Sequence, residues 1–444
     1  MEWTQLLDRR RLCNPKAAEQ PDRPSYIQDA DRITFSAPFR RLANKTQVHP
    51  LYEIDHLHHR LIHSVETASV GRSLGIAVGD WLERDHGLAS GEKHCVAGMV
   101  QAACLAHDIG NPPFGHSGEA AIGRWFTEKF DEKSELFELL DPALRAEFEN
   151  FEGNAQGFRL ISRLELYRNE GGMQLSRGVL GAFAKYPVTA ATKSKLEVPY
   201  CGLKKFGVFE SEIEMFVEVA SAVGLPEETL ANGEKWWRRH PLVFLVEAAD
   251  DICYNILDLE DGFTSGDFAE EMVLEHLNAI GGIPNKDLSD RTSEEIIAYA
   301  RARAVGRAVA GCVDAFKANY ESIMNGTFNG ALVEVSIYKD EFAKIKALAS
   351  KRLFTSPRKT ELEVFGRNVV HRVLDGLVAI LEEVARKNWE ANVLRDYHQQ
   401  LRRATGFDLR DVKDAYSAFH ALTDYVSGMT DRYSVKIAKM VSGA

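Results

Sequence analysis

The sequence predicts a single large, mostly α-helical domain of 444 residues with a small β-hairpin or a few short strands. Long stretches place apolar residues three or four positions apart without an intervening proline, the spacing of an amphipathic helix. Only residues 331–339 (ALVEVSIYK) show a short β-like run. Length alone would allow two or three domains, but no repeat, low-complexity tract or linker divides the chain.

The expected elements follow one another along the chain. Helices are predicted over residues 57–81, 91–106, 117–130, 240–262, 293–324 and 363–388, and a C-terminal helix is predicted to break near Gly428. The helix over 240–262 begins with Pro241 at a favoured first position and stops at Gly262. Residues 185–210 hold five lysines among Pro, Gly, Thr and Tyr, which indicates a long surface loop or a small hairpin.

The composition is that of an ordinary globular protein, with 45% hydrophobic and 27% charged residues. A net charge of -11 argues against a generally cationic nucleic-acid-binding surface, although a local basic channel can lie on an acidic protein. The six cysteines form no CxxC pair, so neither a disulfide framework nor a zinc ribbon is indicated. Without a secretory signal or an apolar window of about 18 residues, a cytoplasmic enzyme or binding protein is expected, with no membrane partner.

Residues 105–121 (LAHDIGNPPFGHSGEAA) concentrate two histidines and two carboxylates around a turn. An apolar run ends at His107 and Asp108, glycines and prolines break the helix, and His116 and Glu119 begin the next one. A buried His-Asp pair at a helix end is costly unless a metal ion or hydrogen bonds compensate it. Imidazole and carboxylate together suit Mn, Fe, Zn, Ni or Mg. His116 and Glu119 could alternatively serve only as a helix cap.

Two other stretches offer side chains that would complete such a site. His63 lies in the first half of the predicted helix 57–81, and Arg60 precedes it by three residues on the same face. In the helix 240–262, Asp250, Tyr254 and Asp258 fall at i, i+4 and i+8, so two carboxylates and a phenol share one stripe. A metal held by ligands from three separate helices is therefore a candidate: His63, His107, Asp108 and Asp250.

The pattern H…HD…D in a helical protein resembles the HD-domain phosphohydrolases. The motifs HDIGNPPFGHSGEAA, FEGNAQGFR, EAADDICY and DYVSGMTDRY together resemble the bacterial dGTP triphosphohydrolase family, and they span most of the chain. The overall length and the segment KKFGVFESE are most similar to the shorter dGTPase-like subgroup. The resemblance implies an HD core over about residues 55–265, with the helical residues 266–444 completing the substrate pocket and an oligomer interface.

The resemblance also implies an activity: hydrolysis of a deoxynucleoside triphosphate, with dGTP expected, to the deoxynucleoside and inorganic triphosphate. The family pattern maps the divalent metal (Mn, Mg or another transition metal) to His63, His107, Asp108 and Asp250. The string EAADD leaves a choice between Asp250 and Asp251; we choose Asp250 because it shares a stripe with Tyr254 and Asp258. His116 is the candidate general acid, oriented and held charged by Glu119.

Substrate contacts are assigned by the same resemblance. Gln47 and Asp258 would lie near the deoxyribose 3′-hydroxyl, and Tyr254 would pack under the sugar and exclude a ribose 2′-hydroxyl. Arg60 would meet a phosphate, and Val48 a base edge. The triphosphate should attract further cations, for which the candidates are Lys204, Lys205 and Arg432. For Tyr254 and Arg60 the alternatives are a core residue and a surface cation.

Two other functions stay open from the sequence. An HD phosphohydrolase acting on nucleoside monophosphates or other phosphoesters is disfavoured by the triphosphate-type motifs. A nucleotide-sensing or single-stranded DNA-binding protein with weak catalysis is supported mainly by the lysines of residues 185–205. Because family members form closed oligomers, a symmetric homo-oligomer is expected, a hexamer or a tetramer.

Overall fold

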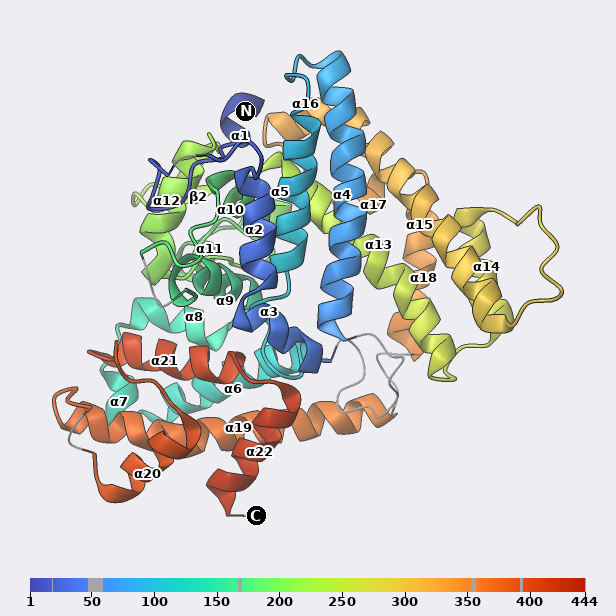
Figure 1. The fold of residues 1–444 in the computed structure, drawn as a ribbon. Helices are drawn as coiled ribbons and strands as arrows, with labels where there is room; N and C mark the ends of the chain where they lie inside the picture. The colour runs from blue at the N-terminus through green and yellow to red at the C-terminus, as the bar shows by residue number, and fades with distance from the viewer. Residues whose placement is uncertain (18, 47–58, 167–169, 353–356, 392–393, 444) are drawn as a thin grey trace.

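The computed structural model describes residues 1–17, 19–46, 59–166, 170–352, 357–391 and 394–443, and these residues fold into an assembly of packed helices (Figure 1). The mostly α-helical fold expected from the sequence is confirmed. The described strands form a single two-stranded sheet. The elements up to residue 164 are α1 (Trp3–Leu6), α2 (Ser25–Thr34), α3 (Ala37–Arg41), η1 (Leu42–Asn44), α4 (Arg60–Asp85), α5 (Lys93–Ala106), α6 (His116–Glu132), α7 (Glu135–Glu138), η2 (Pro142–Leu144), α8 (Arg145–Glu149), α9 (Gly153–Arg159) and η3 (Leu160–Leu164).

Helices α4 and α5 pack against each other with their backbones in close approach. Three glycines at four-residue spacing on α4 face α5. A Cβ atom built on Gly71 would lie 2.5 Å from Cys104 Sγ, and one built on Gly75 would lie 2.6 Å from Ala97 Cα. Larger residues at these positions would therefore force the helices apart. This contact brings the first turns of α4 beside the end of α5, where His63 and His107 lie.

The middle of the chain supplies the third helix of the site. α13 packs against both α4 and α5, and it follows the hairpin of β1 and β2, whose register pairs Glu227 with Trp237. The helix expected over residues 240–262 is observed as α13, and most of its apolar residues are buried. The elements of this region are α10 (Arg177–Phe183), α11 (Ala190–Lys193), η4 (Cys201–Leu203), η5 (Glu210–Glu212), α12 (Ile213–Ala222), β1 (Glu227–Thr229), β2 (Lys235–Trp237) and α13 (Pro241–Thr264).

Two local expectations are corrected here. Residues 331–339 are not a strand: Leu332–Val335 form the short helix α17, which packs against α13, α15 and α18. Burial of Leu332 and Val333 between helices overrides the β preference of this segment. Residues 185–210 are a surface loop only in part: residues 194–199 are irregular and mostly exposed, whereas Val188, Phe206 and Val208 are buried. The segment holds no hairpin, which lies farther along the chain.

The last four helices add a second layer, in which α19 runs beneath α6 and α21 and packs against α22, which crosses it (Figure 1). A cluster of aromatic rings joins this layer to α6, with Phe419 of α21 against Phe126 and Phe137. The predicted break near Gly428 is confirmed. The elements are α14 (Glu270–Gly281), α15 (Ser293–Ala318), α16 (Tyr320–Met324), α17 (Leu332–Val335), α18 (Lys339–Arg352), α19 (Pro357–Arg386), α20 (Asp396–Thr405), α21 (Ala415–Ser427) and α22 (Asp431–Ser442).

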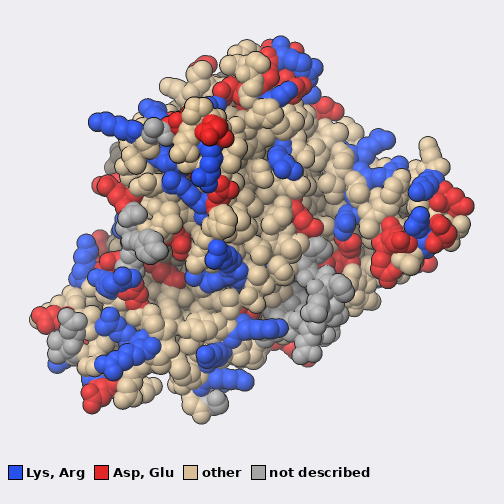
Figure 2. Space-filling view, in the orientation of Figure 1, with Lys and Arg blue, Asp and Glu red and all other residues tan. Residues whose placement is uncertain are grey.

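The surface mixes charges of both signs. On the face shown in Figure 2, acidic side chains gather around α14, whereas basic side chains are more frequent over the lower layer of α19, α20 and α22. Within the described residues, no helix combines the length and the apolar character needed to cross a bilayer.

Candidate metal centre and active site

Four side chains from α4, α5 with its following turn, and α13 converge at one point. Ligand atoms of His63, His107 and Asp108 all lie within 4.8 Å of one another. Asp250 of α13 joins them, with its Oδ1 3.0 Å from His63 Nε2 and 3.5 Å from His107 Nε2. Residues at positions 63, 107, 108 and 250, all named from the sequence, are thus neighbours in space.

The two ring nitrogens of His107 have different surroundings. Its Nδ1 lies 2.6 Å from the backbone oxygen of Cys104, which can only accept, so Nδ1 carries the proton. The other nitrogen, Nε2, is buried and has no hydrogen-bond partner. This nitrogen faces Asp108 Oδ1 at 3.6 Å and Asp250 Oδ1 at 3.5 Å. Three electron-rich atoms that face one another fit a divalent cation, and the Cys104 carbonyl orients the imidazole as metal-ligating histidines are usually oriented.

Asp108 is held ionised and in place by two donors. Arg60 Nη1 donates to its Oδ2 at 2.6 Å, and Asn111 Nδ2 donates to its Oδ1 at 2.5 Å. Burial opposes the charge, but Arg60 and then His107 lower the pKa of Asp108 to about 2. The predicted phosphate contact Arg60 is itself buried, so in this structure its charge serves first to balance Asp108.

The two adjacent carboxylates of α13 have different surroundings. Despite burial, His107 and His63 hold the pKa of Asp250 well below its ordinary range, and the Asp250 hydrogen bond raises the pKa of His63 against the effect of burial. Asp251 points toward α18, with Lys346 Nζ at 3.9 Å, and burial raises its pKa to about 7. Asp250 is therefore the carboxylate that faces the histidines, as the stripe argument expected.

The turn between α5 and α6 is packed against α9. A Cβ atom on Gly153 would lie 2.3 Å from Asn111 Oδ1, so the glycines of the FEGNAQGFR motif permit close approach to the turn. Phe114 and Gly115 both have left-handed backbones, with φ of 63° and 59°. Position 115 must also be small, because a Cβ there would lie 2.5 Å from Arg60 Nη2.

His116 and Glu119 occupy the first turn of α6 in different environments. His116 is exposed at the first helical position. Glu119 is buried, accepts the Gly153 N–H at 2.8 Å and lies 3.8 Å from Lys205 Nζ. Lys205 also donates to Glu152 at 2.9 Å, and burial together with Glu119 raises the pKa of Glu152 to about 7. No hydrogen bond among the described side chains joins Glu119 to His116, so the proposed orienting role stays a prediction.

The remaining predicted substrate contacts are divided between the interior and the surface. Tyr254 and Asp258 lie along α13 beyond Asp250; burial, and next the charges of Asp258 and Asp250, raise the pKa of Tyr254 far above its ordinary value. Lys204 and Arg432 are exposed. Gln47 and Val48 lie outside the described residues.

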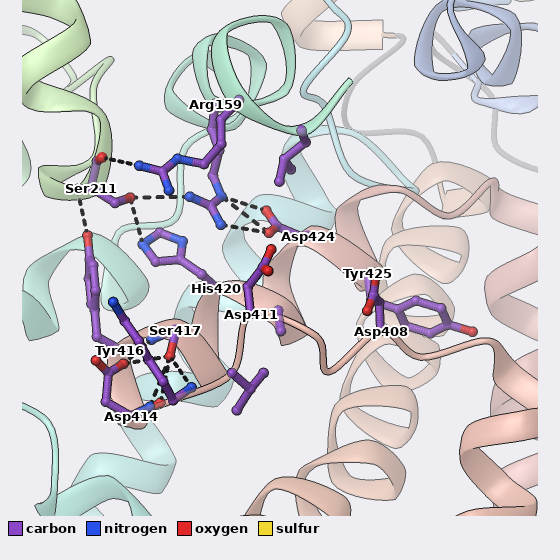
Figure 3. Close-up of a pocket in the computed structure, with 15 residues that line it drawn as sticks. Arg159, Ser211, Asp408, Asp411, Asp414, Tyr416, Ser417, His420, Asp424 and Tyr425 are labelled. Atoms are coloured by element: carbon purple, nitrogen blue, oxygen red, sulfur yellow. Dashed lines mark hydrogen bonds and ion pairs between the residues drawn. The ribbon is translucent and has the colours of Figure 1, made fainter. Parts of the chain in front are cut away.

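A hollow of about 790 Å³ lies elsewhere (Figure 3). Arg159 at the end of α9 spans its wall, donating to Asp424 and to Glu212. None of the four converging residues lines this pocket. We place the candidate chemistry at the His-Asp cluster, because the polar wall of the hollow consists mainly of paired charges.

Three further residues contact the site or its turn: Asn111, Lys45 and Asp431. From the sequence, Lys45 belongs to a basic cluster with Arg40 and Arg41 that could meet phosphates or form a solvated helix face. Asn111 follows Asp108 by three residues, a spacing that could have suggested the hydrogen bond. Lys45 Nζ donates to the backbone oxygens of Asn111 and Ser427, both at 2.7 Å. Asp431 accepts the Phe114 N–H across 317 residues of sequence, so no local pattern could reveal it.

Comparison with known proteins identifies relatives over the whole chain. Residues 60–180 match the HD domain family. A deoxyguanosinetriphosphate triphosphohydrolase-like protein of Synechocystis sp. is 39% identical over 100% of this chain and 99% of its own length. A protein of the same description from Pseudomonas aeruginosa is 36% identical over the same shares. A deoxyguanosinetriphosphate triphosphohydrolase of Yersinia enterocolitica is 28% identical over 95% of this chain and 94% of its own length.

Proposed function

Because the chain belongs to the deoxyguanosinetriphosphate triphosphohydrolase-like family, we propose that it hydrolyses a deoxynucleoside triphosphate, dGTP first among them, to the deoxynucleoside and inorganic triphosphate. The observation that carries the proposal is the buried, unpartnered Nε2 of His107 facing two carboxylates. The predicted hexamer or tetramer and the single-stranded DNA partner stay predictions.

The residues for the metal are His63, His107, Asp108 and Asp250. A divalent ion bound there would neutralise charge at the α-phosphate and activate the attacking water. Arg60 and Asn111 keep Asp108 in its liganding orientation, while the Cys104 carbonyl does so for His107. His63 Nε2 lies 3.0 Å from Asp250 Oδ1 and must lose the proton of this hydrogen bond before it can bind a metal. Metal binding should therefore release protons.

The reaction forms a bond between the water oxygen and the α-phosphorus and breaks the bond from that phosphorus to O5′ of the deoxyribose. The departing O5′ needs a proton, and His116, exposed at the start of α6, is the donor. A cation is disfavoured at a helix N-terminus, and the carboxylate of Glu119 in the same turn offsets this effect. Tyr254 provides the wall that excludes a 2′-hydroxyl.

Product analysis with each dNTP and Mn²⁺ or Mg²⁺ tests the proposal. In ¹⁸O-labelled water, the label should appear in inorganic triphosphate and be absent from the deoxynucleoside. Release of orthophosphate from nucleoside monophosphates would favour the second phosphohydrolase activity, and no product with any substrate would favour a binding protein.

The proton donor is tested by His116→Ala. We expect metal content and nucleotide affinity to persist while turnover falls about 10²- to 10⁴-fold, the usual contribution of general acid catalysis. His94→Ala is the matched control, because His94 is also exposed and lies near the start of a helix, on α5. Wild-type turnover in His116→Ala would overturn the assignment.

A further inference from the structure

Asp431, the first residue of α22, reaches the turn that precedes His116. It is 2% exposed, and its Oδ1 accepts the Phe114 N–H at 3.0 Å. Its Oδ2 accepts from Thr46 twice, at 3.1 Å from the backbone N and 2.7 Å from Oγ1. One carboxylate therefore joins the C-terminal helix, the 45–46 segment and the turn between α5 and α6.

The bonded residue Phe114 is the one whose backbone needs support. A left-handed conformation costs a residue with a side chain roughly 1–2 kcal/mol, and Phe114 adopts it at φ 63°. Gly115 continues the left-handed path, and His116 then begins α6. A change of the backbone at position 114 would redirect the start of α6, and with it the imidazole of His116.

Lys45 secures the other end of the same turn. Its ammonium group bridges the backbone oxygens of Asn111 and Ser427, so the turn is held from residue 111 to residue 114 by neighbours of Asp431. The helix N-terminus at Asp431 also favours a negative charge there. The turn thus has a rigid support built from distant parts of the chain.

We propose that Asp431 is a positioning residue, which sets the place of His116 by fixing the left-handed backbone of Phe114. The inference rests on the proposed function, since it concerns the proton donor of that reaction. Asp431 itself touches no reacting atom; it acts through Phe114 and the start of α6.

The test is a double-variant cycle of Asp431→Ala and His116→Ala, with turnover of dGTP and metal content as readouts. Alone, Asp431→Ala should lower kcat about 10- to 100-fold, as expected for a misplaced catalytic group, and should leave KM and metal content nearly unchanged. In the His116→Ala background the same change should have no further effect on kcat. Equal losses of kcat in both backgrounds would overturn the positioning role.

Asp431→Asn covers the case in which the alanine variant folds poorly. The amide keeps the shape of the side chain but cannot accept from both Phe114 and the Thr46 backbone, so an intermediate loss of kcat is expected. Asp414→Asn is the control, because Asp414 also begins a C-terminal helix but is exposed and caps only α21. It should leave kcat unchanged.

The outcomes separate this inference from the proposed function. Wild-type kcat in both Asp431 variants, with His116→Ala inactive, would overturn only the positioning role. Wild-type kcat in His116→Ala would overturn both the proton donor and the positioning role.

Discussion

Two buried polar clusters have similar residue types but different chemistry. The His-Asp cluster gathers His63, His107, Asp108 and Asp250, while the cluster beside the pocket of Figure 3 gathers Arg159, Glu212, His420 and Asp424. In the second cluster arginine donors alternate with carboxylate acceptors. In the first cluster, imidazole nitrogens and carboxylate oxygens face one another.

His420 and His107 show how the charges around the two clusters differ. One ring nitrogen of His420 also has no hydrogen-bond partner, but burial and then Arg159 and Arg163 lower its pKa well below the ordinary range. These guanidinium groups would repel a metal cation. The free nitrogen of His107 faces carboxylates, which would attract one. The charge that surrounds an unpartnered atom, more than the size of the neighbouring hollow, indicates what can bind there.

The largest expected effect is the loss of metal and of turnover in Asp250→Ala, which removes one residue of the His-Asp cluster. Removing a ligand should deplete the metal and cost several kcal/mol of transition-state stabilisation, about 10³-fold in turnover. Asp251→Ala is the matched control: it should retain the metal, because Asp251 faces Lys346. Elemental analysis of the two purified variants decides the matter, and the reverse pattern would overturn the choice of Asp250.

The next largest effect is a loss of stability when Arg159 is removed from the second cluster. Arg159→Met removes the donor that Asp424 and the fully buried Glu212 share, while Arg163 stays on Glu212 and Gln156 on Asp424. The free energy of unfolding should fall by about 1–3 kcal/mol. The turnover of the folded protein should persist. Chemical denaturation measures the loss, with the exposed Arg403→Met as control, expected within about 0.5 kcal/mol of wild type. Lost metal in folded Arg159→Met would contradict the separation of the two clusters.

The smallest effect, taken per pH unit, concerns Lys45, which contacts the backbone of Asn111 and of Ser427. Burial lowers the pKa of Lys45 from 10.5 to about 7. Between these values the unfolded chain holds a proton that the folded protein lacks, so this group makes stability rise with pH, by at most about 1.4 kcal/mol per pH unit.

Lys45→Met should remove that rise between pH 7 and pH 10.5. Unfolding free energies measured across the window test this, and the comparison uses the slope, since the loss of two hydrogen bonds changes the absolute stability. An unchanged slope would show that Lys45 keeps its ordinary proton affinity when folded.

The sequence by itself determined the helices and the chemically active turn. Periodic apolar positions predicted α4, α5, α6 and α13 to within a few residues, because amphipathic spacing is a local property. It also named His107 and Asp108, since a His-Asp pair at the end of an apolar helix is costly without a partner. Predicted helices before and after the turn offered His63 and Asp250, and the family motifs mapped the same four residues to the metal.

Only the tertiary structure decided which of these groups meet and what supports them. Leu332–Val335 is helical, with Leu332 and Val333 buried between helices, which its β-branched pattern could not foresee. The proton on His107 follows from a contact with the Cys104 carbonyl, and the turn before His116 is held by Lys45 and Asp431. Such contacts join residues up to hundreds of positions apart, and because they depend on how the helices pack, no local pattern encodes them.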